Sequence, residues 1–203
     1  MDYDQMKAED KAKLSSTGKR YFNLIEFDKD ESLICEIRKH AIGLFFIYLT
    51  GIGISLIIAL IFSAISFSDV LSDGMSDVGA SSGNLKSLVT IGGIIFIFFI
   101  LVAMTIQAIL YTNNVIFITS EKIAQVLYIN LFNRKISQLS IGDVQDVTVT
   151  QKGVLAHMFN YGTLVIETAG EQQNYTFTYI PDPYRHSKLI VGAHERNLVQ
   201  FGN

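Results

Sequence analysis

The 203-residue sequence contains no tryptophan, two prolines and a single cysteine. Cys35 alone cannot form a disulfide within the chain or a metal site built from several cysteines, so we expect it to be a small apolar residue in a strand. The formal net charge is −3, and no dense basic stripe occurs. This excludes the usual electrostatic signature of a nucleic-acid-binding protein. Charged residues make up only 17% of the chain.

The shortage of charge is concentrated in two apolar stretches. Residues 41–67 and 88–110 contain no charged side chain over 27 and 23 positions. At about 1.5 Å per residue, a helix of either length exceeds the roughly 30 Å hydrocarbon core of a bilayer. We therefore expect two transmembrane helices joined by an extracytoplasmic loop at 68–87. The alternative is a pair of core helices in a soluble protein, which the length of the runs disfavours.

The distribution of basic residues predicts how the chain crosses the membrane. Eight of the 16 Lys and Arg residues precede the first stretch, seven follow the second, and only Lys86 lies between them. The first stretch also begins too far along the chain for a cleaved signal peptide. The positive-inside rule then predicts a multi-pass protein with both termini in the cytoplasm.

Small residues recur every fourth position in the first stretch, at Gly51, Ser55, Ala59 and Ser63. Such a stripe lets another helix backbone approach closely within a bilayer. It predicts a helix-packing seam. The partner is either the second stretch of the same chain, which we favour, or another copy of the protein.

After residue 110 the pattern changes to the two-residue period of β-strands. We expect strands near 115–119, 123–129, 136–141, 146–151, 163–168 and 175–179, and one helical turn at 153–159. Asp182 and Pro183 are typical of the start of a helix. Residues 111–203 are thus expected to form a cytoplasmic domain, a small β-barrel or sandwich capped by a C-terminal helix. Residues 1–20 are expected to be a mobile tail, and 21–40 an extended segment that joins this domain.

The side chains that could carry chemistry do not form a recognisable site. His186 and His194 are eight positions apart, whereas two histidines on a metal-binding helix are usually four apart. None of the four histidines has the carboxylate spacing of a zinc site, and the sequence has no nucleophile elbow. The sequence therefore predicts no enzyme, no cofactor and no metal.

Several segments in order resemble the bacterial pleckstrin-homology-like (PH-like) family once called the membrane-flanked domain. They are TSEKI, YINLFNRKISQLSIGDVQDVTVTQ, GVLAHMFNYGTLVIETAG and YIPDP. The resemblance covers residues 21–195 and implies a PH-like barrel with a C-terminal helix. The chain departs from the family in having one unit, no Trp near the second stretch, and Asn130 where Gly is common. Asparagine tolerates the positive φ that Gly would supply there.

These observations predict an α+β membrane protein of the bacterial cytoplasmic membrane that acts as a non-enzymatic interaction or assembly module. Its expected partners are the lipid bilayer and either a protein or a second copy. The resemblance implies a role in envelope stress or antimicrobial-peptide resistance. One alternative is an anionic-lipid sensor, with headgroup contacts from Arg38, Lys39, Arg134 and Lys135, although we favour a solvated turn as the explanation of the last two. Another is an accessory subunit of a transporter or membrane enzyme.

Overall fold

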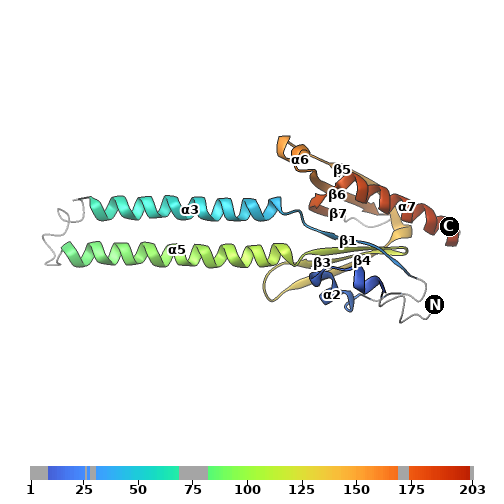
Figure 1. Ribbon diagram of the computed structural model, residues 1–203, viewed down its shortest axis with the longest axis horizontal. Helices are drawn as coiled ribbons and strands as arrows, with labels where there is room; N and C mark the ends of the chain where they lie inside the picture. The colour runs from blue at the N-terminus through green and yellow to red at the C-terminus, as the bar shows by residue number, and fades with distance from the viewer. Residues whose placement is uncertain (1–8, 26, 28–30, 69–81, 169–173, 202–203) are drawn as a thin grey trace. The chain divides into compact units, whose positions relative to one another are not determined.

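The computed structural model of the protein describes residues 9–25, 27, 31–68, 82–168 and 174–201 (Figure 1). The chain divides into a β-rich unit, Met1–Gly43 with Leu110–Asn203, and a helical unit, Leu44–Ile109. The expectation of a mobile tail falls outside the described residues for positions 1–8. Most of the expected loop at 68–87 also falls outside them.

Two long helices account for the charge-free stretches. Helix α3 is Ile42–Phe67 and helix α5 is Ser82–Thr112. By length and composition, both are apolar and long enough to cross a membrane. Helix α5 begins before the second charge-free stretch and includes Lys86, so the end of the expected loop is helical instead. Residues 82–87 contain no proline, so no proline ends the helix there.

Of the four residues of the predicted seam on α3, Gly51 contacts α5. A Cβ atom on Gly51 would lie 2.5 Å from Sδ of Met104, so the glycine admits the Met104 side chain. Gly93 on α5 admits Phe62 from α3 in the same way. Ser55 and Ala59 are half-buried, and Ser63 is exposed. Gly51 therefore contacts the chain's own second helix, while a contact with another copy stays a prediction.

Seven strands form two antiparallel sheets. The first has the order β1-β2-β3-β4, with β1 Leu33–Arg38, β2 Val115–Thr119, β3 Lys122–Tyr128 and β4 Arg134–Ser140. The second has the order β5-β6-β7, with β5 Val144–Thr150, β6 Tyr161–Thr168 and β7 Tyr175–Pro181. Among the described residues the sheets do not close into a barrel. The α+β class and the two-sheet alternative of the prediction are confirmed.

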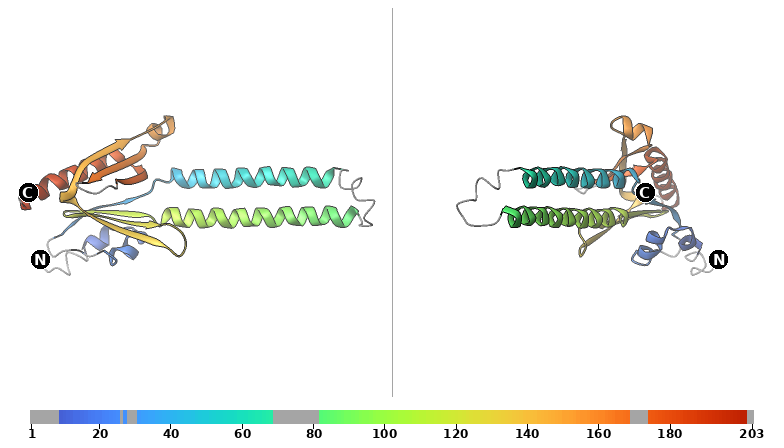
Figure 2. Two further views of the ribbon diagram at one scale, coloured as in Figure 1. Left: turned by 180° about the vertical axis from the view of Figure 1, so that it is seen from behind. Right: turned by 60° about the vertical axis from the view of Figure 1, so that its left-hand side comes forward.

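The main core lies between the inner faces of the two sheets. Helix α7, Pro183–Phe201, packs on β5, β6 and the short 3-10 helix η2, Ile141–Asp143 (Figure 2). It contributes Ile190 and Ala193 to this core. On β7, Phe177 and Ile180 both face the core although they are three positions apart. The regular alternation of faces along β7 is interrupted at Tyr179, whose φ is 56°.

A second core covers the outer face of the first sheet, where the sequence predicted nothing. Helix α2, Ser16–Phe22, packs Tyr21 and Phe22 onto this face, and Leu14 and Ile25 join them. Residues 9–20 are therefore not an unstructured tail, and the segment at 21–40 begins in a helix. Their apolar residues are few, but they cover Val115, Phe117, Ala124 and Val126, which face away from the inner core.

Hydrogen bonds hold this N-terminal segment to β1. Ser15 caps α2 by accepting from the Gly18 amide at 3.0 Å. The Glu36 carboxylate, on β1, accepts from both the amide and the hydroxyl of Ser15. Asp10 accepts from the Leu33 amide at 3.0 Å. The helix start is thus capped by its own serine and fixed to the sheet by a β1 carboxylate.

Candidate functional site

The candidate site lies at the end of the β-rich unit where the chain continues into α3 and returns from α5. We call this the helix-proximal end, made of residues 39–43 and 110–114. Arg38, the last residue of β1, pairs with Val115, the first residue of β2. Three residues separate β1 from α3, and two separate α5 from β2. The helical hairpin therefore occupies the connection between two neighbouring antiparallel strands.

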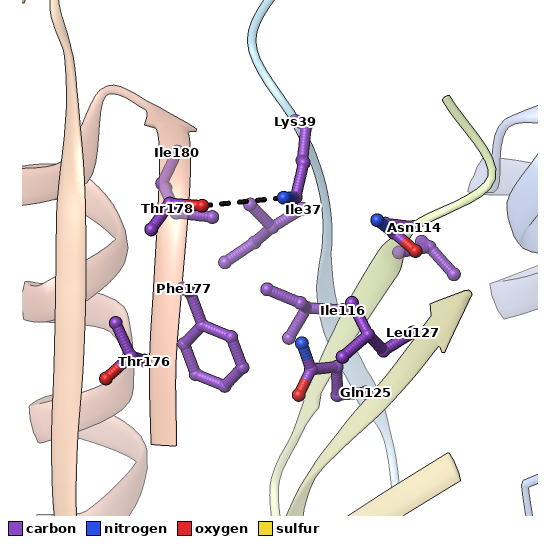
Figure 3. A pocket seen from close by; sticks show the side chains of 11 residues that line it. Ile37, Lys39, Asn114, Ile116, Gln125, Leu127, Thr176, Phe177, Thr178 and Ile180 are labelled. Atoms are coloured by element: carbon purple, nitrogen blue, oxygen red, sulfur yellow. Dashed lines mark hydrogen bonds between the residues drawn. The ribbon is translucent and has the colours of Figure 1, made fainter. Parts of the chain in front are cut away.

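A cleft of about 190 Å³ opens between the two sheets (Figure 3). Strands β1, β2 and β3 form one wall and β7 forms the other. An engineered cavity of about 150 Å³ is enough to hold benzene, so this cleft can hold a small apolar group. Apolar and polar residues are mixed along its walls; they are Ile37, Val115, Ile116, Leu127, Phe177, Ile180, Lys39, Asn114, Gln125, Thr176 and Thr178.

Polar residues at inward-facing positions explain why the core does not extend into the cleft. Gln125 pairs with Ile116 in the ladder, and both face the space between the sheets. Burying an amide without hydrogen-bond partners costs free energy, so the sheets stay apart where Gln125 and Lys39 face inward. Asn114 is buried, and its Oδ1 accepts from the Tyr128 amide at 2.7 Å. That bond ties the chain leaving α5 to the end of β3.

Lys39 is the cation of the cleft. Its Nζ lies 3.4 Å from the Thr178 hydroxyl and 5.2 Å from the centre of the Tyr111 ring (Figure 3). Burial lowers the pKa of this ammonium group. Among the described residues, no carboxylate lies within ion-pair distance of Lys39. A bound anion would stabilise the charged form of Lys39 by supplying the missing counter-charge.

Aromatic side chains fix the chain on both sides of the helical hairpin. The Tyr111 hydroxyl donates to the His40 carbonyl at 2.7 Å, and its ring meets Tyr179 edge-on. His40 Nδ1 accepts from the Ile42 amide at 3.0 Å, at the start of α3. A Cβ atom on Gly43 would collide with the Tyr111 hydroxyl, which explains the glycine there. His40 thus fixes the chain at the start of α3.

The four predicted headgroup contacts are all near the helix-proximal end, but they do not form one patch. Side chains alternate between faces along a strand. Lys39 and Lys135 are accordingly on the cleft side, while Arg38 and Arg134 are on the outer side. Strands β1 and β4 are also the two edges of the sheet, three strand spacings or about 14 Å apart. Only Lys39 lines the cleft.

Arg134 is associated with a pair of tyrosines on the outer face. The Tyr21 hydroxyl donates to the Tyr128 hydroxyl at 2.8 Å. Burial, followed by this bond, raises the pKa of Tyr21 to about 12. The pKa of Tyr128 is lowered, chiefly by the bond from Tyr21 and further by Arg134. The Tyr21–Tyr128 bond therefore joins α2 to the end of β3, with the guanidinium of Arg134 close to the Tyr128 hydroxyl.

The turn between β3 and β4 does not use the positive φ that asparagine tolerates. Asn130 does not have a positive φ. Its side-chain oxygen accepts from the amides of Phe132 and Asn133, at 3.0 and 2.7 Å. Asparagine thus stabilises the turn through a local side-chain bond rather than through the backbone freedom of glycine.

The remaining candidates for chemistry have structural surroundings. Burial raises the pKa of the Cys35 thiol to about 11, so little of it is in the nucleophilic thiolate form near neutral pH. His194 Nδ1 lies 2.7 Å from the Ile141 carbonyl. No group of three or more His, Cys, Asp or Glu side chains that could hold a metal occurs in the described part of the chain.

Except for Lys39, the residues of the cleft were not identified from the sequence, and among them are the polar residues Asn114, Gln125 and Thr178. Gln125 carried a signal, because it interrupts the apolar series Ile123 and Leu127 on one face of a strand. Thr178 carried none, since threonine is common in strands. Asn114 follows directly after an apolar helix, where a polar residue is unremarkable in sequence.

A family model agrees with this architecture. A family model described as "Bacterial PH domain" matches residues 42–188, well over half of the chain. PH domains are generally non-catalytic interaction domains. A solved structure from Shewanella loihica PV-4, of a DUF1696 family protein with a pleckstrin-homology domain, is 14% identical, covering 40% of this chain and 70% of that one, with a TM-score of 0.32. No curated protein matches the chain.

Proposed function

This chain belongs to the bacterial PH domain family, and we propose that it is a non-enzymatic interaction module anchored in the bacterial cytoplasmic membrane. In this proposal α3 and α5 span the bilayer, with the spans at 41–67 and 88–110. The PH-like unit, residues 111–203 with β1 and α2, lies at the inner face. There it binds a protein partner or a second copy of the chain.

The observation that carries the proposal is the shortness of the two connections between the apolar helices and the first sheet. Three residues join β1 to α3, and two join α5 to β2. The Tyr111–His40 hydrogen bond and the Arg38–Val115 pairing further restrict these joins. A PH-like unit attached in this way stays at the membrane surface. Its high local concentration there favours binding to other membrane-bound molecules.

The orientation can be tested with the chain's own cysteine removed. In a Cys35→Ser background, we expect Ser76→Cys, in the connecting loop, to react with a membrane-impermeant maleimide in intact bacterial cells. Glu195→Cys, exposed on α7, should react only after the cells are permeabilised. The physical reason is the excess of Lys and Arg on both flanks, which favours the cytoplasmic side. Gel-shift of the labelled protein measures both reactions.

Two results of this experiment would contradict the proposal. One is labelling of Glu195→Cys in intact cells. The other is recovery of the full chain in the soluble fraction of a lysate without detergent. The double variant Ser76→Cys with Glu195→Cys serves as the control, because permeabilised cells should label it at both positions.

A second function, recognition of an anionic lipid, is favoured by one observation. Lys39 is a half-buried cation that lines an apolar cleft and has no carboxylate within ion-pair distance among the described residues. An anionic headgroup at Lys39 would leave an acyl segment to contact Phe177 and Ile116. Lys135 is on the same side of the sheet. Arg38 and Arg134 are on the opposite side and are not part of this second proposal.

This second proposal predicts a selective loss of bound anionic lipid. The full chain would be released from nanodiscs that contain equal amounts of phosphatidylglycerol and phosphatidylethanolamine, and its lipid adducts counted by native mass spectrometry. Lys39→Met should lower the proportion of phosphatidylglycerol adducts about tenfold, the effect of losing one hydrogen bond to a charged group. Lys188→Met, an exposed site on α7, is the matched control. Equal adduct ratios in the two variants would contradict this function.

A further inference from the structure

Two connections of the β-rich unit expose apolar side chains. The β3–β4 tip, residues 129–133, exposes Ile129 and Phe132 by 57% and 98%. The α6 tip, residues 154–159, is built on the short helix α6, Val154–Met158, and exposes Val154 and Met158 by 80% and 63%. Clusters of exposed apolar side chains commonly mark an interaction surface. The resemblance and the family match assign no role to either tip.

The β3–β4 tip is at the helix-proximal end. Val126 pairs with Val115, and the Tyr128 amide donates to Asn114. Strand β3 therefore ends level with the residues that follow α5. The tip continues two further residues before it turns, which is about 7 Å at 3.3 Å per residue. Phe132 thus lies beyond the first residue of β2, at the helix-proximal end.

The α6 tip is at the same end, on the other sheet. The His40 amide donates to the Tyr179 carbonyl at 2.7 Å, and the ring of His40 lies 5.6 Å from that of Tyr161. Tyr161 is the first residue of β6, immediately after the α6 connection. His40 is two residues before α3. Both tips therefore extend from the end of the β-rich unit that carries the joins to the apolar helices (Figure 1).

Both tips are held in shape by polar contacts at their bases. Asn130 accepts from two amides of the β3–β4 tip. Gln151 Nε2 donates to the Tyr161 carbonyl at 3.1 Å. Ala156, a residue of α6, is buried. The exposed side chains are thus presented by ordered turns. Such preorganisation lowers the conformational entropy that binding would otherwise cost.

The charge around the tips is of one sign. Segments 129–135 and 151–160 contain Arg134, Lys135 and Lys152, and neither contains Asp or Glu. This contrasts with the net charge of −3 for the whole chain. Apolar side chains flanked by cations are typical of segments that lie in the interface of an anionic bilayer.

We propose that both tips insert into the interfacial layer of the anionic phospholipid bilayer in which α3 and α5 lie. This inference rests on the proposed membrane anchoring. The bilayer is the occupant that the observations favour, because the tips are at the end joined to the apolar helices and their flanking charge complements anionic headgroups. With one tip on each sheet, the two insertions would fix the tilt of the PH-like unit on the membrane surface.

The experiment uses the full chain in Cys35→Ser background, in nanodiscs containing phosphatidylglycerol. An NBD fluorophore is attached at Phe132→Cys or Val154→Cys, and its quenching by aqueous iodide is compared with its quenching by lipids that carry a doxyl group. Inserted side chains lie about 5–10 Å into the boundary layer. We therefore expect emission at shorter wavelength, loss of iodide quenching, and strong doxyl quenching at both sites.

Two control sites separate the possible failures. Lys188→Cys on α7 should be quenched by iodide, and Ile57→Cys on α3 should be quenched by the doxyl lipids. This inference alone would be overturned if iodide quenched positions 132 and 154 as strongly as position 188 while the doxyl lipids still quenched position 57. Loss of doxyl quenching at 57 would overturn the membrane anchoring as well. The fluorophores at positions 132 and 154 could also be shielded from iodide in cells but quenched by it in nanodiscs of pure lipid. The tips would then belong to a protein interface, which also overturns the inference.

Discussion

Replacing Phe117 with Ala is expected to lower the free energy of unfolding of the β-rich unit by about 3–5 kcal/mol. Phe117 is fully buried on β2, on the outer face of the first sheet. Its ring meets that of Phe22 edge-on, with the centroids 6.4 Å apart. The substitution removes the aromatic contact and leaves a cavity beneath α2 that rigid strands cannot fill. Pulse proteolysis in urea, on the full chain in detergent micelles, measures the change.

The matched control is Phe132→Ala. The same side chain is removed, but Phe132 is 98% exposed, so the unfolding free energy should change by no more than about 0.5 kcal/mol. Phe117→Ala should also speed tryptic cleavage at Lys19 and Arg20, because α2 loses its contact with the sheet. If the two alanine variants were equally stable, the second core would not contribute to the stability of the β-rich unit.

Replacing Glu31 with Ala is expected to destabilise the unit by about 3–5 kcal/mol. The Glu31 side chain is fully buried, and its carboxylate lies 3.0 Å from Nζ of Lys122. The same carboxylate accepts from the Thr119 hydroxyl, and Thr119 in turn accepts from the Lys122 amide at 2.8 Å. Alanine removes the negative charge and leaves the ammonium of Lys122 mostly buried. Urea unfolding followed by pulse proteolysis measures this loss too.

Two further variants test whether the loss comes from the broken ion pair. The double variant Glu31→Leu with Lys122→Met removes both charges, and it should recover most of the lost stability because no buried charge remains. Lys13→Ala removes the Lys13–Asp10 pair, in which the lysine side chain is 68% exposed. That variant should change the unfolding free energy by less than about 1 kcal/mol. A double variant no more stable than Glu31→Ala would exclude the ion pair as the cause.

The strands were the most predictable part of the fold. Strand β2 begins and ends where the sequence predicted, and β7 begins where predicted. Apolar residues at every second position are a local signal, which is why these elements could be read without knowledge of their partners. The helical turn at α6 and the start of α7 at Pro183 carry equally local signals.

The second core could not be predicted with the same ease. Residues 9–25 are mixed in charge, and their apolar side chains are too few to indicate a helix by periodicity alone. One signal was available: β2, VIFIT, is apolar at four successive positions instead of two alternating ones. A strand with that pattern is covered on both faces. The inner face was accounted for by the second sheet, so the outer face required a cover.

The candidate site depends on register, which the sequence does not specify. Arg38 and Lys39 are adjacent, and adjacency suggested a shared patch with Arg134 and Lys135. Alternation along the strand separates each pair between the two faces, and the strand order separates the pairs by the width of the sheet. Lys122, on the neighbouring strand β3, lies beside Glu31. Distances across a sheet follow from pairing, which becomes known only with the fold.

The direct pairing of β1 with β2 also constrains the order of events during synthesis. Arg38 faces Val115 in the ladder, so the whole helical hairpin must be made before the two strands can meet. At about 5–20 residues per second, β1 leaves the ribosome several seconds ahead of its partner. During that interval the apolar side chains of Ile34, Cys35 and Ile37 lack their final neighbours. The first sheet is thus completed only after both apolar helices have been synthesised.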